Sequence, residues 1–269
     1  MSGLRIRQPH SLSQPYSKAF DMKISSIKVG DLFPMNSGGS VIVVRYQNAF
    51  NVVVEWLDEN KHRAKVRTLD LRKGKGKNPF SASVYGHGFV GVGNYRTTTG
   101  GELTLAYKVW TSMLKRCYSP LYLKKYPTYR GCSVHSDWLS FQSFAAWHEK
   151  EDNSQKIGFD LDKDLRVHEN KVYGPETCSF VPQQINKLLT NCGVLRGDLP
   201  RGVCAAKKYF TASLRVRGKR QKLGSYATPE LAYEVYKKAK EANVKSMAEE
   251  WRDYLHPEVY DYLRVWTLV

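Results

Sequence analysis

Residues 209–217 carry the most constraining pattern in the sequence, because polar and apolar side chains alternate along them without a break. An extended chain places alternate residues on opposite faces, so one face is apolar and the other polar and basic. A turn at Gly218 and a second β-favouring run follow. Thr228 and Pro229 are residue types that begin helices. The apolar positions of that helix are Leu231, Ala232, Val235, Tyr236 and Ala239. The segment predicts a sheet covered on one face by a helix, with a basic face exposed.

This segment resembles a known DNA-binding module. The matching sequence segments are GV at Gly202, KYFTASLRVRGKRQKLGSY from Lys208 and TPELAYEVYKKAK from Thr228. They closely resemble the Apetala/ERF-type DNA-binding domain, which occurs in plant regulators and is appended to phage endonucleases. The resemblance implies a sheet that enters the major groove, with arginines on base edges and on phosphates. By position, the implied contacts are Arg215, Arg217, Arg220 and Lys222, with Tyr209 and Thr211 in support.

The overall charge favours a polyanionic partner. The chain of 269 residues has 42 Lys and Arg against 25 Asp and Glu, a net charge of +17. Together with many Tyr and Trp residues, which can stack on bases, this excess indicates a nucleic acid, and the resemblance above implies that the partner is double-stranded DNA. A membrane partner is disfavoured, because the sequence has no run of about 18 apolar residues and no signal-peptide core.

The segment Gly158–Lys187 carries the candidate catalytic chemistry. Asp160, Asp162 and Asp164 alternate on a strand-like run, and a polar turn, a second β-favouring run and a helical start follow. This order of strand, loop, strand and helix can bring a carboxylate together with the amide oxygen of Asn186. Oxygen ligands of this kind suit Mg²⁺ or Mn²⁺.

The same segment resembles the H-N-H nucleases, and more closely the phage mobile (homing) endonucleases that carry DKD, then YxPExCxFVP, then xxN. The sequence segments from Trp110 to Tyr118 and from Val134 to Trp147 also resemble that family. The resemblance implies that Asp162 is the first metal ligand and Asn186 the last.

The general base is left open by the sequence. Lys163 fills the position of the family's histidine, and a lysine at its ordinary pKa is protonated and cannot accept a proton. Either the surrounding cations depress the pKa of Lys163, or Asp164 or His168 is the base, or the site does not cut. Alternating Asp and Lys is also typical of a solvated strand face.

Two aromatic helices are predicted before this segment. Leu103, Tyr107, Trp110 and Leu114 form one apolar stripe, and a second helix with a broad aromatic face runs from Trp138 to Trp147. Such stripes are typical of a core. Arg116 is a candidate phosphate contact, with a surface ion pair as the alternative. His135 and His148 are expected at the surface.

The N-terminal part predicts a β module behind a basic arm. Short β-favouring runs follow Val29, separated by turn residues, and indicate a small barrel or curled sheet. A basic glycine-rich loop contains three candidate phosphate contacts, Lys73, Lys75 and Lys77. The glycine-rich stretch 84–95 is expected to be a packing loop against the nuclease region or a linker that faces DNA.

Cysteine usage favours a reducing cytoplasm, that of the host cell if the chain is phage-encoded. The five cysteines are scattered, with no C-x-x-C pair. We expect buried free thiols; the alternative, a zinc site with Cys117, Cys132 and His135, matches no standard spacing.

These observations predict an α+β chain in five parts. The parts are a flexible basic arm at 1–28, a β-barrel-like module at 29–95, an H-N-H-like nuclease domain at 96–195, an Apetala/ERF-type domain at 196–245 and a helical tail at 246–269. The expected function is a metal-dependent, sequence-specific DNA endonuclease of the phage mobile type, acting as a monomer or homodimer. The alternatives are an inactive DNA-binding regulator on the same frame and, third, a basic protein that binds nucleic acid without sequence preference.

Overall fold

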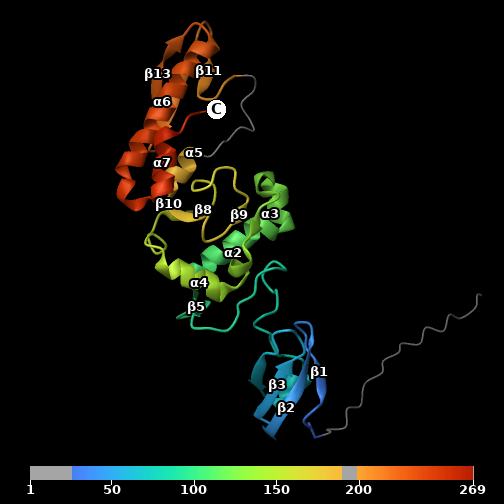
Figure 1. Ribbon diagram of the computed structural model, residues 1–269. Helices are drawn as coiled ribbons and strands as arrows, with labels where there is room; N and C mark the ends of the chain where they lie inside the picture. The colour runs from blue at the N-terminus through green and yellow to red at the C-terminus, as the bar shows by residue number, and fades with distance from the viewer. Residues whose placement is uncertain (1–25, 190–198, 269) are drawn as a thin grey trace, which may run out of the picture. The chain divides into compact units, whose positions relative to one another are not determined.

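The computed structural model describes residues 26–189 and 199–268 (Figure 1), so most of the predicted basic arm lies outside the described residues. The chain is a mixture of helices and short sheets, which confirms the α+β class. It divides into two compact units, Met1–Asn78 and Pro79–Val269. No helix among the described residues is long and apolar enough to cross a membrane.

The first unit is built on a four-stranded antiparallel sheet. Its strands, paired in chain order, are β1 (Leu32–Pro34), β2 (Ser40–Asn48), β3 (Asn51–Trp56) and β4 (Arg63–Val66). Alternate residues of β2 and β3 are buried, as period-two patterning requires. The sheet ends with β4 at Val66. Residues Thr68–Arg72 form a short helix, α1, which buries Leu71.

The basic loop after α1 is folded against the β1–β2 turn. The backbone amides of Gly74 and Lys75 donate to the carbonyls of Leu71 and Asp70 at 3.0 and 2.8 Å. These amides are therefore used within the turn, and the loop presents its lysine side chains instead. Lys73, Lys75 and Lys77 are all exposed.

The glycine-rich stretch 84–95 belongs to the second unit, so the division lies earlier than the predicted boundary at residue 95. The amide of Phe89 donates to Leu139, and its carbonyl accepts from Phe141, both at 2.9 Å. A Cβ on Gly88 would lie 2.4 Å from the Leu114 side chain, so only glycine allows this close approach. Of the two alternatives for this stretch, the packing loop is the one observed.

The helical part of the second unit surrounds an aromatic core. It comprises a hairpin of β5 (Thr98–Thr99) and β6 (Glu102–Leu103), then α2 (Leu105–Tyr118), α3 (Pro120–Lys125), the 3₁₀ turn η1 (Pro127–Tyr129), β7 (Ser133–Val134), the 3₁₀ turn η2 (Ser136–Leu139) and α4 (Phe141–Lys150). The predicted aromatic core is confirmed, because Trp110, Trp138, Phe141 and Phe144 are all buried.

Three details of that region differ from the expectation. Leu103 precedes α2 and is half exposed, because the Thr104 side chain caps the helix by accepting from the amide of Tyr107. Trp138 lies in η2 instead of in a helix. His148 is only 1% exposed and packs between Phe144 and Phe180, so its expected place at the surface is wrong.

The segment from 158 to 189 has the predicted order of strand, loop, strand and helix. β8 (Phe159–Asp162) pairs antiparallel with β10 (Ser179–Pro182), and α5 (Gln183–Leu189) follows directly. Within the loop, β9 (Val172–Tyr173) pairs with β7 in parallel. The loop is therefore held by the helical part of the unit.

The C-terminal sheet consists of β11 (Val203–Ala205), β12 (Phe210–Val216) and β13 (Lys219–Tyr226), in that order. α6 (Pro229–Glu250) covers one face, as predicted. Its buried positions include Ala232, Tyr236 and Lys240, whereas Leu231 is 54% exposed, contrary to the expected stripe.

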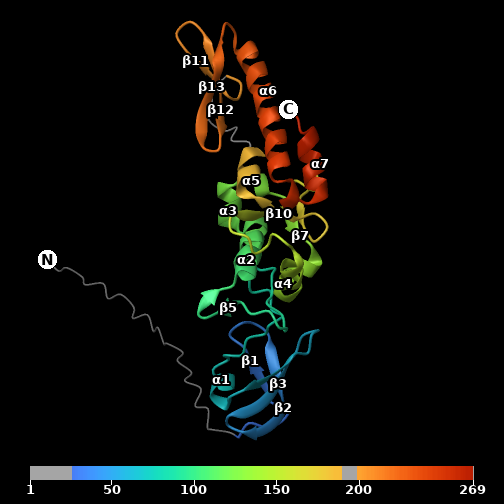
Figure 2. The ribbon, with the colours of Figure 1, turned by 90° about the vertical axis from the view of Figure 1, so that its left-hand side faces the viewer.

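α6 is longer than the sequence indicated and runs through the predicted boundary at 245/246. Its second half packs with Val181, Ile185 and α7 (Pro257–Val265) in a second core, beyond the 3₁₀ turn η4 (Arg252–Tyr254). Figures 1 and 2 show this single helix passing from the sheet to α5 and α7. The sheet and the β8–β10–α5 frame are thus joined by one continuous helix.

Candidate functional site

Asp162 ends β8 and turns the chain into the loop. Its Oδ1 accepts the backbone amides of Asp164 and Leu165 at 2.8 and 2.9 Å. Burial raises the pKa of this carboxyl above its ordinary value, and the two amide hydrogen bonds oppose the rise. Asp162 is therefore a partly buried carboxylate held in one orientation.

Lys163 is buried beside Asp162, with 5% of its surface exposed. Its Nζ donates to the carbonyl of Asn170 at 2.8 Å, forms an ion pair with the carboxylate of Asp164 and lies 5.8 Å from the centre of the Tyr173 ring. The amine acts as a donor in both hydrogen bonds. In this arrangement Lys163 closes the loop.

Asn170 is a site residue that sequence reasoning missed. Its Nδ2 donates to the carbonyl of Lys163 at 2.9 Å and to that of Val172 at 2.6 Å, and its Oδ1 accepts the amide of Val172 at 3.0 Å. An asparagine in a polar turn is unremarkable in sequence, and only these contacts distinguish it.

Arg116 of α2 lies behind β8 in a tyrosine-lined site. Its guanidinium donates to the carbonyl of Leu161 at 3.5 Å and is hydrogen-bonded to Tyr173. Burial raises the pKa of the nearby Tyr129. The charge of Arg116 lowers this pKa, whereas the charges of Asp164 and Asp162 raise it. Arg116 is thus held by the β8 backbone and by Tyr173, and the alternative of a surface ion pair is not what the structure shows.

α5 carries Asn186 and packs beside β8. Gln183, in its first turn, donates to Oδ1 of Asp160 at 3.0 Å. Asp160 and Asp162 share one face of β8, and Asn186 lies three residues after Gln183, on the same side of the helix. The two predicted metal ligands therefore belong to two elements that pack together, β8 and α5.

The hydroxyl of Ser179 is an unpaired polar group next to Asp162. Ser179 is the cross-strand partner of Asp162, is 3% exposed, and its Oγ makes no hydrogen bond within the described residues. The hydroxyl is therefore a polar group beside Asp162 that can donate or accept a hydrogen bond.

The donor set fits a hard divalent cation. A carboxylate and an amide oxygen match the small number of protein ligands that Mg²⁺ takes beside phosphate oxygens. Residues 26–189 and 199–268 contain no group of three or more His, Cys, Asp and Glu side chains that could hold a metal ion. Cys117, Cys132 and His135 therefore do not form such a group, and the zinc alternative is not supported.

The two other candidate bases lie at the solvent-facing side of the loop. The carboxylate of Asp164 is about half exposed, and His168 is exposed with its ring 5.6 Å from that of Tyr262 in α7. Arg166 fixes the loop to α7, because it pairs with Glu258 at 2.9 Å.

The open face of the C-terminal sheet carries most of the predicted DNA contacts. Arg215 pairs across the strands with Arg220, and Ser213 with Lys222, on the face opposite α6. Arg220 donates to Ser213 Oγ at 3.0 Å. The side chains of Arg215 and Lys222 make no hydrogen bond or ion pair within the described part of the chain. Their charges are available to a partner.

The remaining predicted contacts differ in setting. Tyr209, just before β12, is 45% exposed, and Thr211 donates to the carbonyl of Cys204 at 3.3 Å. Arg217 lies outside the strand, in a two-residue turn with Gly218 in which both φ angles are positive, 48° and 80°. Its guanidinium forms an ion pair with Glu250 of α6.

Comparisons of the chain with protein-family models, with curated proteins and with solved structures found no match. The function must therefore be inferred from the residues and their geometry.

The buried cysteines behave as core residues. Cys117, Cys132 and Cys178 are buried free thiols, as expected, whereas Cys204 is exposed; Cys192 lies outside the described residues. Burial raises the pKa of Cys117 and of Cys178 to about 12, so both thiols stay protonated at neutral pH.

Proposed function

We propose that this chain is a sequence-specific, metal-dependent DNA endonuclease of the H-N-H-like phage mobile type, with an Apetala/ERF-type sheet as its recognition module. The observation that carries the proposal is the continuous helix α6. It joins an open sheet face bearing Arg215 and Lys222 to the β8–β10–α5 frame bearing Asp162 and Asn186. A recognition surface and a candidate hydrolytic site are thus parts of one unit.

In this proposal Asp162 and Asn186 hold the Mg²⁺ or Mn²⁺ ion. When bound, such an ion polarises the scissile phosphate and stabilises the leaving oxygen. Arg116, whose guanidinium donates to the carbonyl of Leu161 just before Asp162, would offset the negative charge that develops on the phosphate. Asp164 and His168 are the candidates for the base, because Lys163 donates in both of its hydrogen bonds. One such site cuts one strand, so a monomer would nick and a homodimer would cut both strands.

Binding would draw on the first unit as well. Its exposed Lys73, Lys75 and Lys77 lie on one loop and would contact phosphates without reading sequence.

The test is cleavage of pooled phage-genome DNA by the purified protein with Mg²⁺ or Mn²⁺. Asp162→Ala and Asn186→Ala should each abolish discrete, metal-dependent products. Asp152→Ala, at an exposed carboxylate outside the site, is the matched control and should cut normally. Full cleavage by either site variant would refute the assignment of the metal ligands.

A sequence-specific DNA-binding regulator on the same frame is the second candidate, and the placement of Lys163 favours it. A buried ammonium next to Asp162 repels a divalent cation and cannot serve as a base while it donates. Selective binding at raised salt with no cleavage under any metal would support this candidate, since purely electrostatic binding collapses with salt. Lys163→His would then restore a histidine at the position of the general base, and cleavage would be measured in this variant.

A further inference from the structure

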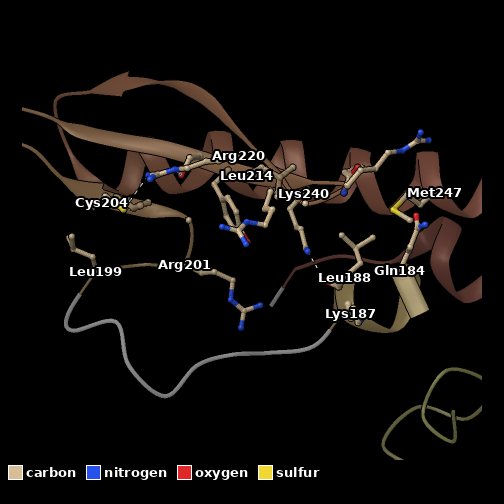
Figure 3. Close-up of a pocket in the computed structure, with 18 of the residues that line it drawn as sticks. Gln184, Lys187, Leu188, Leu199, Arg201, Cys204, Leu214, Arg220, Lys240 and Met247 are labelled. Atoms are coloured by element: carbon tan, nitrogen blue, oxygen red, sulfur yellow. Dashed lines mark hydrogen bonds between the residues drawn. The ribbon is translucent and has the colours of Figure 1, made fainter. Parts of the chain in front are cut away.

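A cleft opens where the C-terminal sheet meets α5. β11 pairs only with residues 210–212 of β12, so the later part of β12 extends beyond the end of β11. Between this part of β12, the second half of α6 and α5 lies a space of about 1120 Å³ (Figure 3). It is large enough to hold part of an extended ligand.

The cleft is strongly basic. Among the described residues that line it, one carboxylate, Glu250, accompanies six cations: Lys187, Arg201, Arg215, Arg217, Arg220 and Lys240. Glu250 is already paired with Arg217, and cations outnumber carboxylates among these lining residues. Like charges gathered in one concavity raise its potential and favour an anion there.

Lys240 lies at the junction of the two cores along α6. Its Nζ donates to the carbonyl of Leu188, near the end of α5, at 2.5 Å. Burial, and then the charge of Arg201, lower the pKa of this lysine to about 8. Figure 3 shows Arg201 and Lys240 extending toward the space beside α5 from different elements. The cations therefore come together in the folded chain from positions far apart in sequence.

We infer that this cleft binds the sugar–phosphate backbone of one DNA strand on its way from the recognition sheet to the cleavage site. The inference rests on the proposed function and names a part of its partner. Residues at the two ends of the cleft define the path of this strand. Arg215 and Arg220 belong to both the open sheet face and the cleft, and Lys187 directly follows Asn186 on α5. A strand that leaves the sheet along these cations reaches the proposed metal ligands.

The test uses two duplexes built on a sequence selected by the wild-type protein from a random pool. The short duplex carries only the sequence bound by the sheet, and the long one continues toward the cut position. Lys187→Ala and Arg201→Gln should each weaken binding of the long duplex by about tenfold. Each should also reduce the slope of log K against log salt by about 1. Binding of the short duplex should be unchanged.

Lys238→Ala and Lys245→Ala are matched controls, because both lysines are exposed on α6 and do not line the cleft. They should bind both duplexes as the wild type does, and thermal unfolding checks that every variant is folded.

Three results would overturn the inference. The cleft variants could bind the long duplex normally, or lose affinity equally for both duplexes. Alternatively, the wild type could gain nothing from the longer duplex while ATP raises its melting temperature, which would make the cleft a mononucleotide site. If the wild type selects no sequence at all, the proposed function itself fails.

Discussion

Lys163 and Asn170 are hydrogen-bonded to each other twice, each through its side chain to the backbone carbonyl of the other. Lys163 Nζ donates to the Asn170 carbonyl at 2.8 Å, and Asn170 Nδ2 donates to the Lys163 carbonyl at 2.9 Å. The pair closes the loop immediately after Asp162. Lys163 is therefore part of the loop's internal support.

Asn170→Ala should loosen that loop. It leaves the carbonyl of Lys163 and the amide of Val172 without their side-chain partner, at a cost of about 1–3 kcal/mol. Denaturant unfolding measures this loss. Cleavage or sequence-specific binding should fall as well, whereas Asn60→Ala, at an exposed turn, should leave both unchanged. Unfolding identical to that of the wild type would show that the reciprocal pair does not support the loop.

Asp162→Asn should raise stability while it abolishes metal-dependent cleavage. The folded-state pKa of Asp162 is raised, so its stabilising contribution is complete below the ordinary value of 3.8 and is lost as pH rises through the folded pKa. At neutral pH the buried charge is therefore a cost. Asparagine removes the charge and keeps an oxygen that can accept the amides of Asp164 and Leu165. A melting temperature below that of the wild type at pH 7 would contradict this reasoning.

His148 should make the chain less stable in mild acid. Burial lowers its pKa below the ordinary 6.5, so the unfolded chain binds more protons, and stability falls as pH drops through 6.5 toward the folded pKa. The slope contributed by one group is at most about 1.4 kcal/mol per pH unit. His148→Phe places an apolar ring between Phe144 and Phe180 and removes the titrating group. It should therefore flatten this part of the profile of stability against pH. An unchanged pH profile in the variant would assign the acid sensitivity to other groups.

Gly202→Ala should unfold the C-terminal sheet selectively. Gly202 has a φ of +78°, and a Cβ there would lie 2.1 Å from the Tyr236 ring. Positive φ and overpacking together should cost about 2–5 kcal/mol. Amide hydrogen exchange would then show lost protection in β11 and β12 with β2 and β3 unaffected. Gly218→Ala, with positive φ but open space around it, separates the backbone strain from the clash.

Arg215→Ala should weaken specific DNA binding more than Arg217→Ala. Arg215 stands unpaired on the open sheet face, and a base contact is worth about 1–3 kcal/mol, or about 5- to 150-fold in affinity. Arg217 is held by Glu250, so it has less to offer DNA. Titration of the selected duplex measures both. Equal effects would mean that the ion pair opens when DNA binds.

The sequence by itself determined the local elements. The alternation in 209–217, the Thr228–Pro229 start and the β8–β10–α5 order all follow from period-two or helical patterning and from capping residues, which act within a few positions along the chain. The α+β class and the face of the sheet that α6 covers follow from these patterns as well.

Only the tertiary structure decided which distant groups meet. Arg116 lies beside Tyr173, Lys163 closes its loop on Asn170, and α6 continues past residue 245 because its second half finds apolar partners on β10, α5 and α7. The basic cleft likewise gathers cations from α5, α6 and the sheet. Such contacts depend on packing between segments far apart in sequence, and periodicity carries no information about which of those segments adjoin.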